Sequence, residues 1–306
     1  PTEQIQGATA TATIVASGVA NQTVTLESAY YGPVWHVATT GSDITGDGQA
    51  ESPFATIQHG IDMSSDGDTV LVAEGTYVEN VWLPNSIHLI SESGPSQTII
   101  DATVEQYNWT SAIRLGPENQ NVSITGFTLT GGKSYNDFDQ GYLGGAILSW
   151  YDSGSLVISN TLFINNDIEF WIPDGGQTIE INNCTFLLGD AQWPLVFSYL
   201  SQNIDVTSSI LYGDSNYVSL MSQQDVVLNI SHSLISPTFN INEDFSDNGD
   251  NVFADPLFCN PDSGNYTLAE NSPCVGTGEN GADMGAFGVG CGPYNFSPTD
   301  FSLSTP

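Results

Sequence analysis

The chain has almost no cationic side chains. Among its 306 residues are 35 Asp and Glu but only two Lys or Arg, Arg114 and Lys133, so the formal net charge is -33 at pH 7. Proteins that bind nucleic acid or anionic membranes need Lys and Arg to displace counterions from phosphates. We therefore exclude nucleic acid and anionic membranes as partners. Salt that screens charges over ~10 Å or less relieves such self-repulsion, which favours a saline extracellular setting.

Long apolar runs and zinc-type cysteine pairs are also missing. No run of 18 apolar residues exists, so we expect no membrane insertion. No basic and then apolar leader begins at Pro1, so an export signal would already have been removed. The four cysteines have no CxxC spacing, and three lie in the last 50 residues, which favours one disulfide there. We favour Cys259 with Cys291, leaving Cys184 and Cys274 as buried core residues; Cys274 with Cys291 is the nearest competitor.

What the chain does contain is an internal repeat. Five short β-type segments align on β-branched anchors that are separated by 34, 23, 25 and 24 residues: Ile124, Ile158, Ile181, Val206 and Ile230. A second apolar column is Leu129, Phe163, Phe186, Leu211 and Ile235. A period near 24 residues is about one turn of a three-sided parallel solenoid, in which a stack of rungs buries what one rung cannot. The repeat predicts an all-β fold, a right-handed parallel β-helix, and the 34-residue interval predicts a loop inserted at 131–139.

Between the two columns lies a bend. Its positions are Gly126, Asn160, Asn183, Ser208 and His232. Gly and Asn tolerate left-handed backbone, and side-chain amides can hydrogen-bond from rung to rung. We expect a structural role for this column.

The ends of the chain differ from the repeat. Residues 1–33, rich in Ala, Thr and Val, are predicted to be a β-strand extension that pairs along the solenoid or with another chain, and residues 293–306 a linker. The solenoid is expected over 34–292. At its start, residues 52–63 predict a short amphipathic helix with Ser52 as N-cap and Pro53 at N1, which would cap the open end.

Several stretches resemble one known group of proteins. Residues 35–43, 53–58 and 66–77 resemble the opening of secreted pectate-lyase-like right-handed β-helix proteins, and residues 255–259, 266–269, 272–274 and 282–288 look like their last rungs. The resemblance covers 34–292 and implies the fold; the group includes lyases, hydrolases and adhesins, so it does not imply one function. Residues 301–306 also resemble the linker before a type IX secretion sorting domain of marine and related bacteria.

The resemblance implies two kinds of catalytic site. Lyases of this fold use Lys or Arg as a base or as a clamp on a uronate, often with calcium, and only strand residue Arg114 or loop residue Lys133 could serve. An anionic polymer would then have to enter a negative field. Inverting hydrolases need carboxylates about 6.5–9.5 Å apart, for which Asp152, Glu169 and Asp174 are candidates. The Asn-x-Asp, Asp-Asp and Gly-His-Gly signatures of polygalacturonase-like hydrolases are missing, so we expect no catalytic site.

Calcium is the cofactor that we expect, and no organic cofactor. Asp43 and Asp47, and likewise Asp247 and Asp250, place carboxylates on Gly-containing turns, which hard cations favour. Neither stretch has the spacing of an EF-hand loop, so ordinary polar turns are the alternative.

A stripe of large side chains is the candidate ligand-binding surface. A rough register places Leu148 and Phe170 in the core and Ile147 on the surface. The outward residues that could stack on sugar rings or bury against another protein are Tyr151, Trp171 and Met221. A register slip of one residue would send them into the core.

The sequence thus favours a non-catalytic extracellular β-solenoid. It would be a surface, matrix or adhesive protein that contacts polysaccharide or other copies of itself through its flat faces and its N-terminal strand. The alternative is a polysaccharide-degrading enzyme of the pectate-lyase-like fold, either a lyase or a glycoside hydrolase.

Overall fold

The computed structural model describes ten stretches of the chain. They are residues 34–103, 111–116, 120–137, 141–149, 154–167, 170–171, 177–188, 203–213, 227–237 and 245–295. The chain divides into two units, residues 1–30 and 31–306, and every described residue belongs to the second. The predicted strand extension at 1–33 and most of the predicted linker, 296–306, lie outside the described residues.

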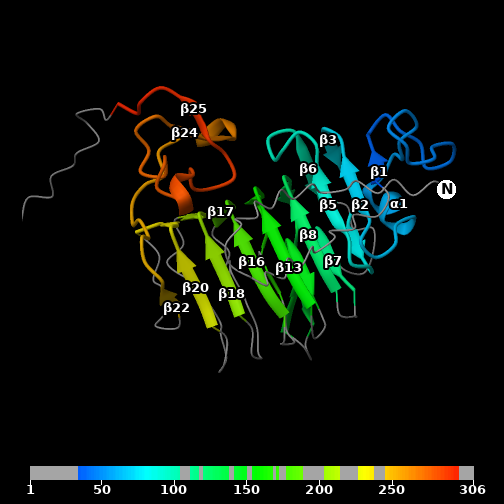
Figure 1. Ribbon diagram of the computed structural model, residues 1–306, viewed down its shortest axis with the longest axis horizontal. Coiled ribbons are helices and arrows are strands. Elements are labelled where there is room, and N and C mark those ends of the chain that lie inside the picture. Colours follow the sequence, from blue (N-terminus) through cyan, green and yellow to red (C-terminus); the bar gives the residue numbers. More distant parts are fainter. Residues whose placement is uncertain are drawn as a thin grey trace, which may run out of the picture. The chain divides into compact units, whose positions relative to one another are not determined.

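Three parallel sheets build the solenoid (Figure 1). The nine-stranded sheet contains, in order, β1 (Val34–Val37), β2 (Thr69–Val72), β5 (His88–Ser91), β8 (Gln120–Thr125), β13 (Gly154–Ser159), β16 (Gln177–Asn182), β18 (Asn203–Thr207), β20 (Val227–Ser231) and β22 (Phe245–Asp247). The seven-stranded sheet contains β3 (Gly75–Tyr77), β6 (Thr98–Asp101), β9 (Thr128–Thr130), β14 (Leu162–Ile164), β17 (Thr185–Leu188), β19 (Ile210–Gly213) and β21 (Leu234–Ile235). The four-stranded sheet contains β4 (Val81–Leu83), β7 (Ile113–Leu115), β12 (Ile147–Ser149) and β15 (Phe170–Trp171). Successive strands in the chain enter successive sheets, so the predicted parallel β-helix is confirmed.

The predicted apolar columns are direct register partners. The anchor column runs Ile124, Ile158, Ile181, Val206 and Ile230 across adjacent strands. The second column runs Leu129, Phe163, Phe186, Leu211 and Ile235. All ten side chains are buried in one continuous cluster, in which the rings of Phe163 and Phe186 stack 4.5 Å apart. Burying each such side chain contributes about 1.5–3 kcal/mol, so the stack stabilises strands that no single rung could.

The predicted bend has the left-handed backbone that its residue types suggest. Its φ values are positive, from 48° at Asn160 to 86° at Gly126. The rung-to-rung bonds come from the backbone, as when Asn183 N donates to Thr207 O at 3.1 Å. The expectation of a side-chain amide ladder is wrong at Asn183, because its Nδ2 donates instead to Asp283 O, 100 residues along the chain.

A buried ladder of side-chain acceptors follows the bend. Cys184 N donates to Ser209 Oγ, Ser209 N to Ser233 Oγ, and Ser233 N to Asn251 Oδ1, at 3.0–3.1 Å. These bonds satisfy backbone groups where the chain changes sheets. Burial raises the pKa of the Cys184 thiol to about 12, so this thiol stays protonated and unreactive.

The helix caps the solenoid, but it begins later than the sequence suggested. The helix α1 (Ile57–Asp62) has Thr56 as its N-cap, whose side chain accepts from His59 N, so the assignments of Ser52 as N-cap and Pro53 as N1 are wrong. Residues 48–54 instead close the free edge of β1: His36 N donates to Gly48 O and Phe54 N donates to His36 O. The buried Ile57 and Ile61 join the core at this end.

The long interval in the repeat contains a hairpin. Strands β10 (Ser134–Asp137) and β11 (Gly141–Gly144) pair antiparallel, with Ser134 opposite Gly144. The insertion therefore begins where it was expected, but it extends beyond residue 139 to Gly144 and forms strands of its own.

The C-terminal residues 255–292, here called the clasp, form a separate sheet of β23 (Phe258–Asn260), β24 (Asn265–Ala269) and β25 (Val289–Cys291). The clasp also contains the short helices η1 (Pro261–Ser263) and η2 (Glu279–Gly281). A disulfide joins Cys259 to Cys291, with Cα atoms 5.9 Å apart, while Cys184 and Cys274 are buried free thiols. The clasp does not add to the nine-stranded sheet, as last rungs would.

The clasp packs on the outer face of the seven-stranded sheet. Ile210 and Leu234, which alternate with the inward Leu211 and Ile235, form a second apolar cluster with clasp residues that include Met284. Polar contacts fix the clasp in place. Gly285 N donates to Ser208 O at 2.7 Å, Ala286 N to Thr185 Oγ1 at 2.9 Å, and Glu279 N to Ser208 Oγ at 2.8 Å.

Two glycines of the clasp, Gly285 and Gly281, both have a left-handed backbone, but only Gly285 is closely packed. Gly285 has φ +90°, and a Cβ there would lie 2.6 Å from Ile210 Cδ1 and 2.8 Å from Thr185 Oγ1. Gly281 has φ +79° and nothing within 4 Å of the same position. We expect both Ala variants to lose about 1–2 kcal/mol from the left-handed backbone, and Gly285→Ala to lose about 1–3 kcal/mol more from overlap. Urea unfolding measures both losses, and equal losses would contradict this packing of the clasp.

Candidate functional site

The outer face of the nine-stranded sheet is lined by polar side chains. Side chains of a strand alternate between faces, so the neighbours of the buried anchors point outward. Register places them in three columns, here called the polar face. The columns are Ile90, Thr125, Ser159, Asn182, Thr207 and Ser231; His88, Ser123, Val157, Glu180, Asp205 and Asn229; and Asn121, Ser155, Thr178 and Asn203. Among them only Ile90 and Val157 are apolar, and none is buried.

Hydrogen bonds between rungs orient these side chains. His88 Nδ1 lies 2.7 Å from Ser123 Oγ, and Asn229 Nδ2 donates to Asp205 Oδ1 at 2.7 Å. Such contacts reduce the rotamer freedom that binding would otherwise have to remove. The polar face is therefore an ordered array with a repeat of about 4.8 Å along the solenoid.

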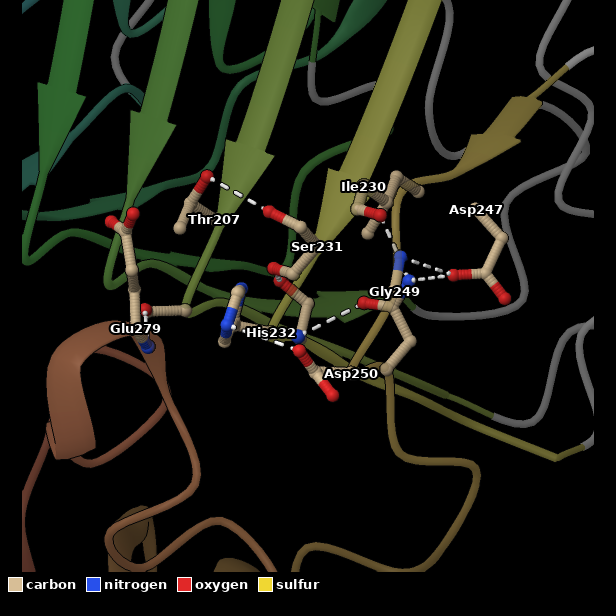
Figure 2. Close-up of polar contacts among 11 residues, drawn as sticks. Thr207, Ile230, Ser231, His232, Asp247, Gly249, Asp250 and Glu279 are labelled. Carbon is tan, nitrogen blue, oxygen red and sulfur yellow. Dashed lines mark hydrogen bonds and ion pairs between the residues drawn. The ribbon is translucent and has the colours of Figure 1, made fainter.

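At the C-terminal end, the polar face meets an imidazole and carboxylates (Figure 2). Thr207 Oγ1 lies 3.5 Å from Ser231 Oγ, and His232 follows at the bend. His232 Nε2 lies 3.4 Å from Asp250 Oδ2, while its Nδ1 is buried without a hydrogen-bond partner among the described residues. Glu279 approaches the same border from the clasp.

The residues at this border include the three residue types of a catalytic triad, but they do not form one. Ser208, His232 and Asp250 supply a hydroxyl, an imidazole and a carboxylate from neighbouring turns, the groups of a serine-hydrolase triad. However, Ser208 is 3% exposed and its Oγ accepts from Glu279 N. A hydroxyl that the clasp covers cannot reach a substrate, so the border offers contacts rather than a nucleophile.

The two cations lie away from the polar face. Arg114 is in β7 of the four-stranded sheet, where its register partners are Trp82 and Leu148, and Lys133 is exposed just after β9 of the seven-stranded sheet. The other catalytic candidates, Asp152, Glu169 and Asp174, lie outside the described residues.

The surface position assumed for Ile147 in β12 is wrong. Ile147 pairs with Phe170, and both are fully buried. Leu148, which pairs with Trp171, is also buried, as expected. The error arose because both Ile147 and Leu148 are apolar, so alternation could not choose between them. The stripe itself stays a prediction, since Tyr151, Met221 and the side chain of Trp171 lie outside the description.

The first pair of predicted calcium ligands accepts hydrogen bonds from backbone N–H groups and from one hydroxyl. Asp43 Oδ1 accepts from Ala55 N at 2.7 Å and Thr56 N at 3.1 Å, and its Oδ2 accepts from Thr56 Oγ1 at 2.8 Å. Burial opposes ionisation of Asp43, but these hydrogen bonds outweigh it and lower the pKa below 3.8. Asp47 Oδ1 accepts from Gln49 N. Both side chains thus shape the approach to α1.

The second pair of predicted calcium ligands, Asp247 and Asp250, contact different partners. Asp247 Oδ1 accepts from Gly249 N and Asn251 Nδ2, at 3.0 and 2.7 Å, while Asp250 faces His232. Within the described stretches, no three His, Cys, Asp or Glu side chains are grouped closely enough to hold a metal ion. Calcium binding therefore stays a prediction.

Because of Asp43, the free energy of unfolding should depend on pH in the acidic range. Its pKa is lowered in the folded state, so its ionised form stabilises the fold above the unfolded pKa near 3.8, and this contribution is lost as pH falls through the folded value. We expect Asp43→Asn, which keeps one acceptor oxygen, to cost about 1 kcal/mol or less at pH 7. Urea unfolding of both proteins from pH 7 to pH 3 should show the difference shrinking toward low pH; a difference that grows would contradict this role.

Comparison with known proteins finds likeness at the level of structure. No family model and no curated protein sequence matches the chain. Among solved structures, the pectin methylesterase PemA from Erwinia chrysanthemi is 14% identical, with a TM-score of 0.38 over 69% of this chain and 68% of that chain. A rhamnogalacturonan lyase is 13% identical, with a TM-score of 0.34 over 66% of this chain and 68% of that chain. The assignment of the fold rests on the strand topology described above.

Proposed function

We propose that this protein is a non-catalytic, extracellular adhesive or matrix β-solenoid whose polar face binds a neutral polysaccharide. The supporting observation is the three-column array of hydroxyl, amide and carboxylate groups on the nine-stranded sheet. Sugar hydroxyls both donate and accept, so they match such a mixture. The columns contain no Lys or Arg, and the chain carries a formal charge of -33, so a polyanionic uronate would be repelled.

The repeat of the array suits a polymer. A chain of sugars that lies along the solenoid would meet an outward side chain in each column at intervals of about 4.8 Å, close to the length of one extended sugar unit. Each contact is weak in water, but many linked contacts add through effective concentration. The proposed ligand is therefore long and extended, and short oligosaccharides should bind poorly.

An extracellular location and association between copies complete the proposal. The Cys259–Cys291 disulfide is of the kind that persists in oxidising compartments. Association through the N-terminal strand segment, residues 1–33, would array many polar faces on one surface. Among the described residues, no helix is long and apolar enough to cross a membrane.

A matched pair of threonines tests the polar face. Thr125 lies on the polar face and Thr130 on the outer side of the seven-stranded sheet, in the same rung and with similar exposure. We expect Thr125→Tyr to obstruct a ligand on the polar face and weaken retention on insoluble neutral polysaccharides by about ten-fold or more. Thr130→Tyr should bind as the parent protein does.

The same assay tests the alternatives. Retention and product release are scored on a panel of polysaccharides, with and without calcium, and electron microscopy of the same samples reports self-association. Equal loss in both Tyr variants, or no retention on any glycan, would contradict the proposed face. Release of unsaturated or reducing ends would favour the enzyme instead.

A further inference from the structure

A cavity of about 260 Å³ lies at the N-terminal end of the solenoid, away from the border shown in Figure 2. Its lining comes from the turn after β1, the start of α1, the end of β3, and the connection from β3 to β4. The lining residues that matter here are Thr39, Thr56, Thr76, Tyr77, Val78 and Glu79. The lining thus includes three threonines, a tyrosine, a valine and one acidic residue.

The carboxylate of Glu79 has donors on one side only. Its Oε1 accepts from Ile57 N at 2.9 Å and its Oε2 from Gln58 N at 3.0 Å, so each oxygen keeps acceptor capacity. Glu79 is 6% exposed, and within the described residues no Lys, Arg or His lies within ion-pair distance of it. Burial raises the pKa of Glu79 despite the two N–H bonds, as expected for a buried charge without a counterion.

We propose that this cavity binds a primary alkylammonium group, with the ammonium at Glu79 and the alkyl stem against Tyr77 and Val78. A charge-assisted bond to Glu79 compensates the buried charge, and neighbouring threonine hydroxyls accept the remaining N–H donors. Val78 is half exposed at the rim, so the stem has a path outward. The field of 35 acidic side chains draws cations toward the protein.

Other ligand classes fit the cavity less well. An anion would meet Glu79, with Asp43 close enough to interact with it. Calcium takes 6–8 oxygen ligands, usually several of them carboxylates, and Glu79 is the single carboxylate of the lining. A neutral alcohol would leave the carboxylate uncompensated. The site is separate from the polar face, so it does not depend on the function proposed there.

The alkylammonium group can come from an amino sugar or from a lysine side chain of a partner. Both present the same cation, but a lysine carries a longer apolar stem. Comparison of glucosamine with Nα-acetyl-lysine methylamide therefore identifies the source: preference for the lysine derivative indicates a protein partner, and preference for glucosamine indicates a glycan.

The binding experiment uses the full chain and n-butylammonium chloride as the probe. Titration is followed by isothermal calorimetry and by the ¹³C signal of the Glu79 carboxyl. We expect saturable binding with a shift of that signal, whereas n-butanol, sodium chloride and calcium chloride at matched concentrations should give neither. Binding of n-butanol equal to that of n-butylammonium, or an equal response to calcium, would overturn the proposal.

Variants locate the cation. Glu79→Gln removes the charge, and we expect binding to weaken about ten-fold or more. The matched control is Glu92→Gln, at a carboxylate that is 43% exposed beside His36 and does not line the cavity, which should bind as the parent does. Because Glu79 also receives the first N–H groups of α1, Val78→Phe provides a second test at an exposed rim position and should block entry while the fold is kept. Unchanged binding in a folded Glu79→Gln or in Val78→Phe would contradict the site.

Discussion

The structure depends on one constraint: no rung can bury its own apolar side chains. Each short strand exposes its inward residues unless another rung stacks on it, and stacking in register brings Ile124, Ile158 and Ile181 into one column. The same register also determines which side chains point to solvent, because a shift of one residue would exchange the inward and outward faces of a strand. The polar columns of the nine-stranded sheet are thus a consequence of the buried columns behind them.

Much of this could be predicted from the sequence because the repeat is visible there. The anchors recur at intervals of 23–25 residues over four rungs, and left-handed bend residues lie between two apolar columns, so the solenoid and its bend followed directly. The conformation of the residues just before α1 could not be predicted in the same way. Residues 52–54 look like a helix start, but the unpaired edge of β1 competes for their backbone, and that tertiary contact leaves Thr56 as the cap.

The border of the candidate site was missed for a related reason. His232 was assigned to the bend and Asp250 to a turn, and nothing in the repeat joined them. The last interval, from Leu228 to its partner Phe245, is 17 residues, shorter than the repeat, so alignment at the earlier period does not place Asp250 beside His232. The polar face had a sequence signal, the polar residues that alternate with each anchor, but alternation alone could not show that His88 and Ser123 would bond across rungs.

The closed edge of β1 has a consequence for how such a protein changes in length. Residues 48–54 occupy the hydrogen-bonding positions where a further strand would attach, so a new turn cannot simply be appended before the first one. Duplication or deletion of whole turns in the interior, where each turn presents the same columns above and below, leaves both termini and their seals intact. Gene variation by entire units in the middle of the molecule would then lengthen or shorten the polar face without redesigning either end.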